Sequence, residues 1–284
     1  MAGASMKDIK LRIKSVESTM QITKAMELVA SSKLRRAKER QERLRPYFTG
    51  LKETMDEIEA ATNDLSSPYQ HKREVKKRCL IVIAGDRGLA GGYNSNVFKA
   101  VTALCEDGVP VCVLPIGKRA VEFFSRKGYE LVTGEFAEAA TISVSDCFTI
   151  ARLVAQGYVS ERFDEVTIVY TRFVSMLTQT PDTALLLPLE AQEHERRTGI
   201  EPLVLYEPSP SAVYDAIVPN YLAGMLYGAM CESVASELGA RRTAMDAASK
   251  NAAEMIDDLS LRYNRARQGA ITQEITEIVA GAEH

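Results

Sequence analysis

Two long stretches near the ends of this chain contain almost no proline, the residue that most strongly interrupts a helix. Between residues 6 and 65 the only proline is Pro46, and between residues 221 and 280 there is none. At 1.5 Å of rise per residue, about 60 helical residues would form a rod roughly 90 Å long. Such a helix is longer than the domain that this chain could build, so it must supercoil with a partner helix or extend into another molecule.

Apolar residues in the second stretch recur with the seven-residue period of a coiled coil. Sustained heptads of this kind bring one face of a helix against a partner helix. Small alanine side chains in such a seam let two helix backbones come close and make a thin rod, although core packing explains them equally well. The expected seam consists of Leu238, Met245, Ala252, Leu259 and Ala266, with Ala248 and Met255 at the intervening position.

The first stretch has a similar pattern with a change of register, which would locally alter the supercoil. The steps of four and three residues begin with Ile9, Ile13, Val16 and Met20. The seam then shifts to Ile22, Met26 and Val29. Two such stretches on either side of a globular-looking middle predict an intramolecular antiparallel pair. The alternative is two separate amphipathic helices packed on a bundle.

Between about residues 78 and 188 the pattern changes to short apolar runs that alternate with helical segments. This alternation is typical of an α/β domain with a mostly parallel sheet. Gly128 is the expected stop of one helix, and Ser143 is the expected cap of another. The expected strands are 79–84, 111–116 and 166–173, with a short apolar run at 185–189, and the expected helices are 97–106, 118–127 and 143 to about 163.

The predicted architecture is therefore helix, α/β domain, helix. The fold class is α/β, with a long antiparallel coiled coil of the N- and C-terminal helices and an inserted Rossmann-like α/β domain. We expect the N-terminal helix in residues 1–65, the α/β domain in 66–207 and the C-terminal helix in 208–284. A charged loop is expected at 190–199, and four prolines between positions 202 and 219 precede the last helix.

The composition excludes several classes of site. The five cysteines form no C-x-x-C pair, which fits a reducing cytosol and argues against disulfides and a zinc site. None of the three histidines lies near a serine or cysteine in a nucleophile arrangement, so neither a hydrolase triad nor a histidine metal site is expected. We find no secretory signal and no run of about 18 apolar residues, so no membrane span is expected.

The sharpest candidate for chemistry is the glycine-rich run at residues 84–96, AGDRGLAGGYNSN, between an expected strand and an expected helix. Glycines allow close backbone approach, and a helix N-terminus attracts phosphate, so a nucleotide-binding α/β enzyme is one alternative. However, the run lacks the lysine of a P-loop and the spacing of a dinucleotide fingerprint. The other interpretation is a tight turn whose glycines permit unusual dihedral angles.

The charge of the chain is distributed unevenly. Residues 1–45 hold twelve Lys or Arg and five Asp or Glu, a net charge of +7, whereas the whole chain carries −3. Such asymmetry usually indicates a partner of opposite sign. An acidic protein partner, a solvated helix face and a nucleic-acid-binding adaptor all remain open, although no aromatic residues interleave as stacking platforms. The basic run comprises Lys33, Arg35, Arg36, Lys38, Arg40, Arg43 and Arg45.

Four motifs resemble the γ subunits of F-type ATP synthases. Residues 22–37, ITKAMELVASSKLRRA, are similar to the N-terminal helix of that family, and residues 263–280, YNRARQGAITQEITEIVA, to its C-terminal helix. Residues 243–251, TAMDAASKN, and 85–94, GDRGLAGGYN, match other stretches, so the resemblance covers essentially the whole chain. The insertion that carries a redox-active cysteine pair in chloroplast members is absent here, which favours a bacterial-type subunit without thiol regulation.

The resemblance implies a mechanical role without an active site, a cofactor or a metal. The coiled coil would stand as a rotating shaft in the α3β3 hexamer of F1, with the α/β domain beside the ε subunit and on the c-ring of F0. Each β subunit would meet a different face of the shaft, so rotation would couple ion flow to conformational cycling of β. The chain would be peripheral, at the cytoplasmic face of the bacterial cell membrane, and would associate with the membrane only through the complex; nucleic acid is not an expected partner.

The resemblance also assigns contacts by motif position. Lys24 and Met26 correspond to residues near the acidic lever segment of β, and Arg267 and Gln268 correspond to contacts with the β catch loop. Arg87 is a further candidate for contact with β. The residues expected to face the c-ring are Leu205, Tyr206 and Glu207.

Overall fold

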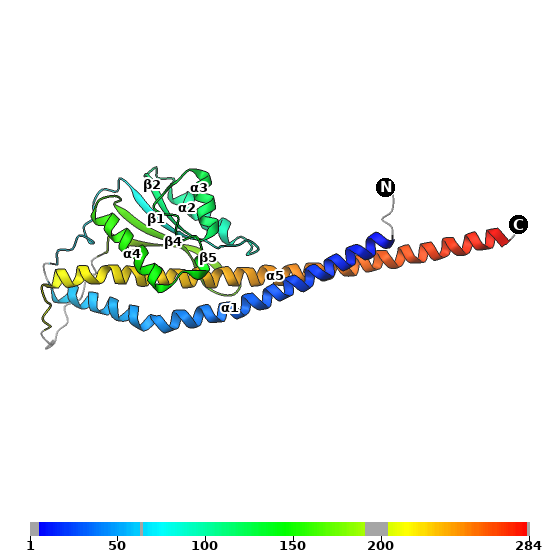
Figure 1. The fold of residues 1–284 in the computed structure, drawn as a ribbon, viewed down its shortest axis with the longest axis horizontal. Coiled ribbons are helices and arrows are strands. Elements are labelled where there is room, and N and C mark those ends of the chain that lie inside the picture. The colour runs from blue at the N-terminus through cyan, green and yellow to red at the C-terminus, as the bar shows by residue number, and fades with distance from the viewer. Residues whose placement is uncertain (1–5, 63–64, 191–203, 283–284) are drawn as a thin grey trace. The chain divides into compact units, whose positions relative to one another are not determined.

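The computed structural model describes residues 6–62, 65–190 and 204–282 (Figure 1). The chain forms two compact units, a smaller one of Met1–Ser32 with Arg241–His284 and a larger one of Lys33–Ala240. Two long helices take part in both units, α1 (Met6–Ala61) and α5 (Pro210–Ala282). The prediction of long helices at both ends of the chain, with an α/β domain between them, is confirmed.

A five-stranded sheet in the order β3-β2-β1-β4-β5 forms the centre of the larger unit. Strands β1 to β4 are parallel, as expected, while β5 pairs with β4 in the antiparallel direction. The strands are β1 (Arg78–Ile83), β2 (Val111–Ile116), β3 (Glu130–Leu131), β4 (Glu165–Phe173) and β5 (Gln179–Leu187). The shorter helices are α2 (Tyr93–Leu104), α3 (Lys118–Lys127), α4 (Val144–Val159) and the 3-10 turn η1 (Ala139–Thr141).

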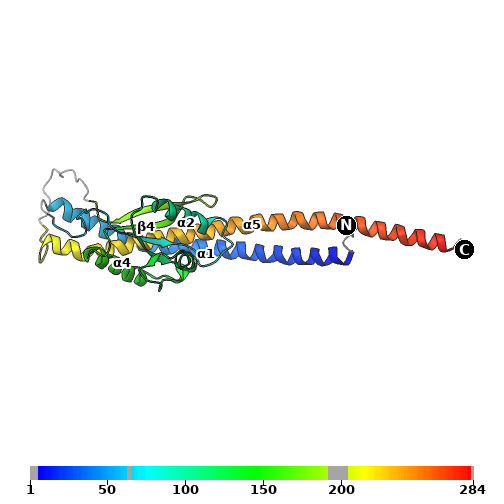
Figure 2. The same ribbon diagram turned by 90° about the horizontal axis from the view of Figure 1, so that it is seen from above.

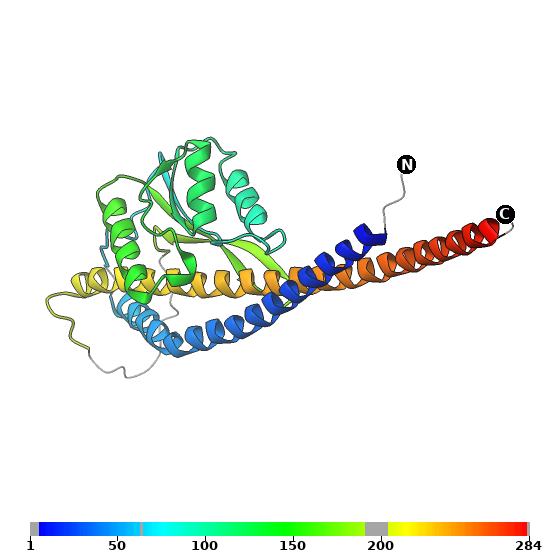
Figure 3. The same cartoon turned by 45° about the vertical axis from the view of Figure 1, so that its right-hand side comes forward.

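Helices cover both faces of this sheet (Figure 3). Successive residues of a strand point to opposite faces, and β1 is buried on both. Leu80 and Val82 pack with apolar residues of α2 and α3. Ile81 and Ile83 belong to the other cluster, which also contains residues of α4, α1 and α5. The larger unit is therefore a three-layer α/β structure whose second helical layer includes parts of the two long helices.

Helix ends in the larger unit follow the expected local signals. Helix α3 spans the predicted residues, and Gly128 after it adopts a φ of 76°, a left-handed conformation that glycine favours. Ser143 caps α4 through a reciprocal box: its Oγ accepts the Asp146 N–H at 3.2 Å, and Asp146 Oδ2 accepts the Ser143 N–H at 2.7 Å. These bonds hold the pKa of the Asp146 carboxyl below its usual value. The helix ends at Val159, earlier than predicted.

Two predictions around the start of the last helix are wrong. The apolar run at 185–187 is not isolated. It is the end of the antiparallel strand β5, which starts at Gln179 and includes Pro181. Helix α5 begins at Pro210, close to the expected start at residue 208, but Pro219, which was expected to precede the helix, lies inside it. Proline suits the first turn of a helix because its missing N–H needs no partner there. Apart from its first residue, the predicted loop at 190–199 lies outside the described residues.

Within the larger unit, α1 and α5 run antiparallel. The Phe48 and Tyr227 rings lie 6.1 Å apart, and Glu59 Oε1 accepts the Tyr214 hydroxyl at 2.6 Å. Residue numbers therefore rise along one helix as they fall along the other. Phe48 packs directly on Gly224, where an added Cβ would lie 2.3 Å from the ring. This glycine allows the close approach of the two helices.

The smaller unit is an antiparallel pair formed by the remaining parts of α1 and α5 (Figure 2). Thr23 Oγ1 lies 2.7 Å from Ser249 Oγ, and Arg242 Nε lies 4.0 Å from Glu27 Oε1. Together these contacts fix the antiparallel direction. The predicted pairing of the terminal helices thus holds in each unit.

The composition of the seam in the smaller unit differs from the prediction. The break of register in α1 is wrong, because Ile22 and Val29 are exposed while Thr23 and Ala30 are buried. Steps of four and three continue from Met20 through Thr23 and Glu27 to Ala30. The seam keeps its period and has two polar members, Thr23 and Glu27, between the apolar Met20 and Ala30.

The seam of α5 is also corrected at its intervening position. Met255 is 49% exposed, whereas Ser249 is buried. The intervening residues are therefore Ser249 and Ile256 instead of Ala248 and Met255. The buried hydroxyl of Ser249 bonds to the Met245 carbonyl of its own helix and to Thr23 across the seam, contacts that an apolar pattern alone does not reveal.

Candidate partner-binding surfaces

The glycine-rich run folds as a loop after β1 that its own side chains hold in place. Asn94 Oδ1 accepts the Gly85 N–H at 2.8 Å, and the Gly85 carbonyl accepts the Arg119 N–H at 3.1 Å. Gly91 has a φ of +56°, a conformation that other residues adopt only with strain. These features favour the tight-turn interpretation, in which the glycines serve the conformation of the loop.

The carboxylate of Asp86 lies where a parallel α/β sheet can bind a phosphate. Its Oδ1 accepts the N–H groups of Lys118 at 3.2 Å and Ala139 at 2.8 Å, and its Oδ2 accepts the Ala140 N–H at 3.0 Å. Since Lys118 is the first residue of α3, the N-terminus of this helix already holds an anionic group. A phosphate there would meet the charge of Asp86. The geometry disfavours the nucleotide-binding alternative, and failure of the isolated chain to bind ATP stays a prediction.

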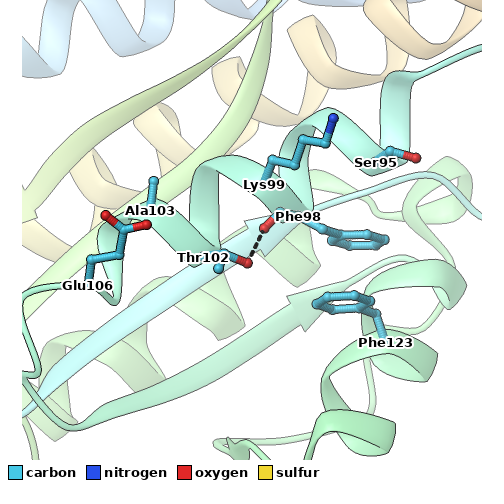
Figure 4. Close-up of a pocket in the computed structure, with 7 residues that line it drawn as sticks. All are labelled: Ser95, Phe98, Lys99, Thr102, Ala103, Glu106 and Phe123. Atoms are coloured by element: carbon cyan, nitrogen blue, oxygen red, sulfur yellow. Dashed lines mark hydrogen bonds between the residues drawn. The ribbon is translucent and has the colours of Figure 1, made fainter.

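A shallow groove of about 390 Å³ lies between α2 and α3 (Figure 4). The Phe98 and Phe123 rings stack in it, 4.2 Å apart and nearly parallel. The Thr102 hydroxyl donates to the Phe98 carbonyl at 2.9 Å, so it is already bonded within its own helix. The charged members of the lining, Lys99 and Glu106, do not converge on one point (Figure 4). This arrangement does not form a nucleophile, an acid–base pair or an anion site.

Most of the cysteine side chains are shielded from solvent. Cys79, Cys112, Cys147 and Cys231 are buried, and Cys105 is partly buried. Burial raises the pKa of Cys147 to about 12, so its thiol stays protonated at neutral pH. Insensitivity of the assembled enzyme to thiol oxidation and reduction stays a prediction.

The described part of the chain offers neither a metal-binding cluster nor a membrane-spanning helix. Residues 6–62, 65–190 and 204–282 contain no group of three or more His, Cys, Asp or Glu side chains placed to hold a metal ion. None of the helices in those residues is long and apolar enough to cross a membrane. The remaining candidates are surfaces that could bind other proteins.

Lys24 and Met26 lie on α1 in the smaller unit, next to its polar seam. The Lys24 side chain is exposed, and its Nζ lies 3.0 Å from Glu27 Oε2. Met26 is half-buried. Glu27 is therefore shared between Lys24 and Arg242 of the other helix, which links the exposed residue to the seam. Contact of Lys24 and Met26 with β stays a prediction.

Arg267 and Gln268 are exposed near the C-terminal end of α5. Thr23 lies opposite Ser249, and Arg267 follows Ser249 by 18 residues, or roughly 27 Å of helix. The structure therefore does not bring the two predicted contact pairs together. They are separate points along one rod.

The end of α5 carries an apolar stripe that the sequence analysis missed. Helix α5 extends past the start of α1 (Figure 2), and within residues 267–279 every side chain except that of Ala270 is exposed. Ile271, Ile275 and Ile278 are spaced by four and three residues and so share one face. The sequence signal for it is that apolar residues keep their helical spacing in α5 beyond the point where α1 begins. We call these three residues the apolar stripe.

The other predicted contact residues lie in the larger unit. Arg87 is exposed in the glycine-rich loop after β1. Leu205 and Glu207 are exposed, while Tyr206 is half-buried and packs against the apolar cluster that contains α4. Leu205 is 80% exposed, so its side chain is accessible to a partner. Contact of these three residues with a c-ring stays a prediction.

The basic run forms an exposed surface on α1 within the larger unit. All seven of its Lys and Arg side chains are exposed, and only two acidic residues interrupt them. Lys38 Nζ lies 4.3 Å from the centre of the Phe173 ring, so one cation contacts the end of β4. Arg35 Nε lies 3.9 Å from Glu39 Oε1, and the exposed surface as a whole keeps an excess of positive charge for a partner of negative charge.

Comparison with known proteins places the chain among γ chains along nearly its whole length. A family model described as ATP synthase matches residues 5–284. The ATP synthase gamma chain of Ruminococcus albus is 50% identical over 279 residues, which cover 97% of this chain and 96% of that protein. The ATP synthase gamma chain of Alkaliphilus metalliredigens is 48% identical over 286 residues, which cover 99% of each chain.

A solved structure shows a similar fold. It is the central stalk and c-ring of the mitochondrial ATP synthase of Tetrahymena thermophila. The matching chain is 25% identical with a TM-score of 0.59, over 80% of this chain and 99% of that chain. The similarity therefore extends over most of this chain.

Proposed function

Because this chain belongs to the ATP synthase γ-chain family, we propose that it is the rotating central stalk of an F1F0 ATP synthase and has no active site of its own. The observation that carries the proposal is the exposed end of α5. Its apolar stripe, Ile271, Ile275 and Ile278, suits burial in the cavity of a surrounding protein ring. A single helix is only about 10–12 Å wide, which suits a bearing at the centre of such a ring.

The shaft acts by presenting different faces to identical partners. Two antiparallel helices have no threefold symmetry, so each β subunit of an α3β3 hexamer meets different side chains. A partner can shift a conformational equilibrium only by its differential affinity for the two conformations. Turning the shaft therefore changes which β subunit is open and which is closed, and it couples ion flow to ATP synthesis.

Charge supports contact between the shaft and the β subunits. The exposed basic run on α1 complements an acidic lever segment, and Lys24 adds a cation further along the same helix. Arg267 on α5 is suited to a charge-assisted bond with a carboxylate of the catch loop. Such contacts form and break in every turn, so they act on rates more than on assembly.

The larger unit supplies the foot of the rotor in this proposal. Leu205 and its neighbours Tyr206 and Glu207 face the c-ring, and the α/β domain also binds the ε subunit. The chain is then held peripherally, at the cytoplasmic face of the bacterial membrane, through the complex alone. In this scheme the mechanical segments are residues 1–65, 66–207 and 208–284.

Reconstitution with the α and β subunits of the same source tests the proposal. The triple variant I271S/I275S/I278S removes the apolar stripe, and V159S removes one exposed apolar side chain at the end of α4 as a control. We expect the triple variant to bind α3β3 at least tenfold more weakly, because three apolar side chains lose their buried environment. The control should bind like the unmodified chain.

Circular dichroism of each isolated chain would show whether the helices are intact, since serine lowers helix propensity only slightly. Equal affinity of the triple variant and the control for α3β3 would overturn the assignment of this helix end to the ring. Failure of the unmodified chain to assemble with α3β3 would overturn the proposed function as a whole.

A further inference from the structure

At the end of strand β4, beyond its pairing with β1, the backbone forms hydrogen bonds with helix α5. The pairing of β1 with β4 ends at Val169, two residues before Thr171. Thr171 is buried, so its backbone groups need partners in the protein. Its N–H donates to Ser233 Oγ at 3.1 Å, and its carbonyl accepts the Ser236 hydroxyl at 3.0 Å. Helix α5 thus satisfies both backbone groups of one strand residue.

Ser233 and Ser236 are placed for this by their spacing. Residues three apart on a helix lie on the same face, so both hydroxyls reach one residue of the strand. Both side chains are buried. Directly before them, α5 contacts the rest of the larger unit mainly through apolar side chains such as Leu222, Leu226 and Met230. The contact therefore changes from apolar to polar within about two turns of the helix.

Close packing flanks the two hydrogen bonds. A Cβ added to Gly85 would lie 2.8 Å from the carboxylate of Glu237, and one added to Gly239 would lie 3.2 Å from the Phe173 ring. The glycine-rich loop and the end of β4 thus pack closely against α5 next to Ser236. We call the contact of residues 233–239 with Thr171 and this loop the polar joint.

We propose that Ser233 and Ser236 are positioning residues that transmit torque between the α/β domain and the shaft helix, an inference that rests on the proposed rotary function. Apolar contact has no preferred direction, so it resists separation more than sliding. Hydrogen bonds depend steeply on distance and angle. A turn of α5 by about 20° would move an oxygen about 5 Å from its axis by roughly 1.7 Å, enough to break either bond. The polar joint therefore fixes the angle between helix and sheet.

The test compares S233A/S236A with a control, S145A/S160A, which changes two exposed serines at the ends of α4. Both are assembled into α3β3γ, with a probe on α3 attached through K127C in a C105S background. The angular spread of the probe during catalytic pauses gives the torsional stiffness between shaft and α/β domain. Amide exchange of Thr171 reports the hydrogen bonds, and thermal unfolding of the isolated chain reports stability.

We expect S233A/S236A to exchange the Thr171 amide at least tenfold faster and to halve the torsional stiffness, while the control changes neither. The conservative variant S233T/S236T keeps both hydroxyls and should restore the stiffness. Lower thermal stability with unchanged stiffness would mean that the serines only satisfy a buried strand end, and would overturn the proposal. If the double variant fails to assemble, S236A alone removes one bond and should show the same effects at smaller size; unchanged stiffness there also overturns the proposal. Absence of any rotation in the unmodified complex would instead contradict the rotary function itself.

Discussion

The two units of this protein bury apolar surface in different ways. The larger unit covers both faces of a sheet, so β1 alone places Leu80, Ile81, Val82 and Ile83 out of contact with water. The smaller unit is a pair of helices with a single seam, and large apolar residues such as Leu28 remain outside it. The larger unit is stabilised by its own core. The smaller unit has apolar surface left over for other proteins.

Polar groups are also used differently in the two units. In the larger unit they satisfy the ends of elements, as Ser143 does for α4 and Ser236 does for β4. In the smaller unit the pair Thr23–Ser249 lies in the middle of the seam. A polar position in a coiled coil specifies register at some cost in stability. In the smaller unit, polar contacts therefore fix the register of the two helices, and apolar burial contributes less to stability than in the larger unit.

The largest expected effect is a difference in the free energy of unfolding between two leucine-to-alanine substitutions, one in each unit. Leu80→Ala leaves a cavity in the central strand and should lower the free energy of unfolding by about 2–5 kcal/mol. Leu28→Ala removes a side chain that is 62% exposed and should change it by less than about 0.5 kcal/mol. Urea unfolding followed by circular dichroism measures both. Similar losses in the two variants would erase the contrast between the units.

The next effect concerns the exposed end of the rod. Arg267→Ala and Gln268→Ala should lower ATP turnover of the assembled α3β3γ complex by tenfold or more. A charge-assisted bond is worth about 1.5–3 kcal/mol when it is lost from the rate-limiting step. The unfolding of the isolated chain should not change, because both side chains are exposed.

Arg262→Ala provides the control for these substitutions. Arg262 lies on the same helix, but its Nη2 is paired with Asp258 at 2.8 Å, so it should matter less for turnover. Wild-type turnover in the Arg267→Ala/Gln268→Ala double variant would show that this helix end makes no catalytically relevant contact.

A smaller effect is expected in the polar seam. The Thr23 and Ser249 hydroxyls share one buried hydrogen bond, so Thr23→Val and Ser249→Ala should couple by about 0.5–1.5 kcal/mol in a double-mutant cycle. The free energy of unfolding of the four chains provides the measurement. Strictly additive losses would show that the bond does not contribute to the pairing of the helices.

The last prediction concerns how the stability of the larger unit depends on acidic pH through Asp164. Burial opposes ionisation of Asp164, but a 2.6 Å bond from Arg73 Nε and the N–H groups of Lys76 and Lys77 outweigh it and hold its pKa below the usual value. A carboxyl with a lowered pKa in the folded state stabilises the protein above its unfolded pKa of about 4. This contribution is lost as the pH falls through the folded value.

Asp164→Asn should therefore flatten the fall in unfolding midpoint that begins below about pH 5 and continues through the lowered pKa of this carboxyl. The measurement is a series of urea titrations at fixed ionic strength, with the exposed Asp257→Asn as the control. An equally steep pH dependence in Asp164→Asn would assign the acid sensitivity to other carboxyl groups.

Much of the larger unit could be predicted because its signals are local. Gly128 and Ser143 mark helix ends through their own backbone and side-chain preferences, and both were located correctly. The course of β5 was missed because its apolar residues lie only at one end, and its pairing with β4 is a tertiary contact. Pro219 was taken as a helix boundary, but proline within a long helix is tolerated where packing compensates for the lost bond.

The candidate surfaces were less predictable than the fold. The sequence indicated the period of the seam. Because only apolar residues were assigned to it, Ile22 and Val29 were predicted to be buried and Thr23 was not, whereas the structure shows the reverse. The bond between Thr23 and Ser249 becomes visible only when the partner helix is in place. The polar joint was missed for the same reason, because serines in a helix give no signal until the strand that they contact is known.

Direct observation of rotation is the most decisive measurement. A probe fixed to the α/β domain of the unmodified chain, in an immobilised α3β3γ complex supplied with ATP, reports whether this chain turns as the β subunits cycle. The account predicts rotation in one direction with three pauses per turn, one for each β subunit, at a rate that follows ATP hydrolysis. Continued hydrolysis with a stationary probe would contradict the central claim that this chain is the rotor.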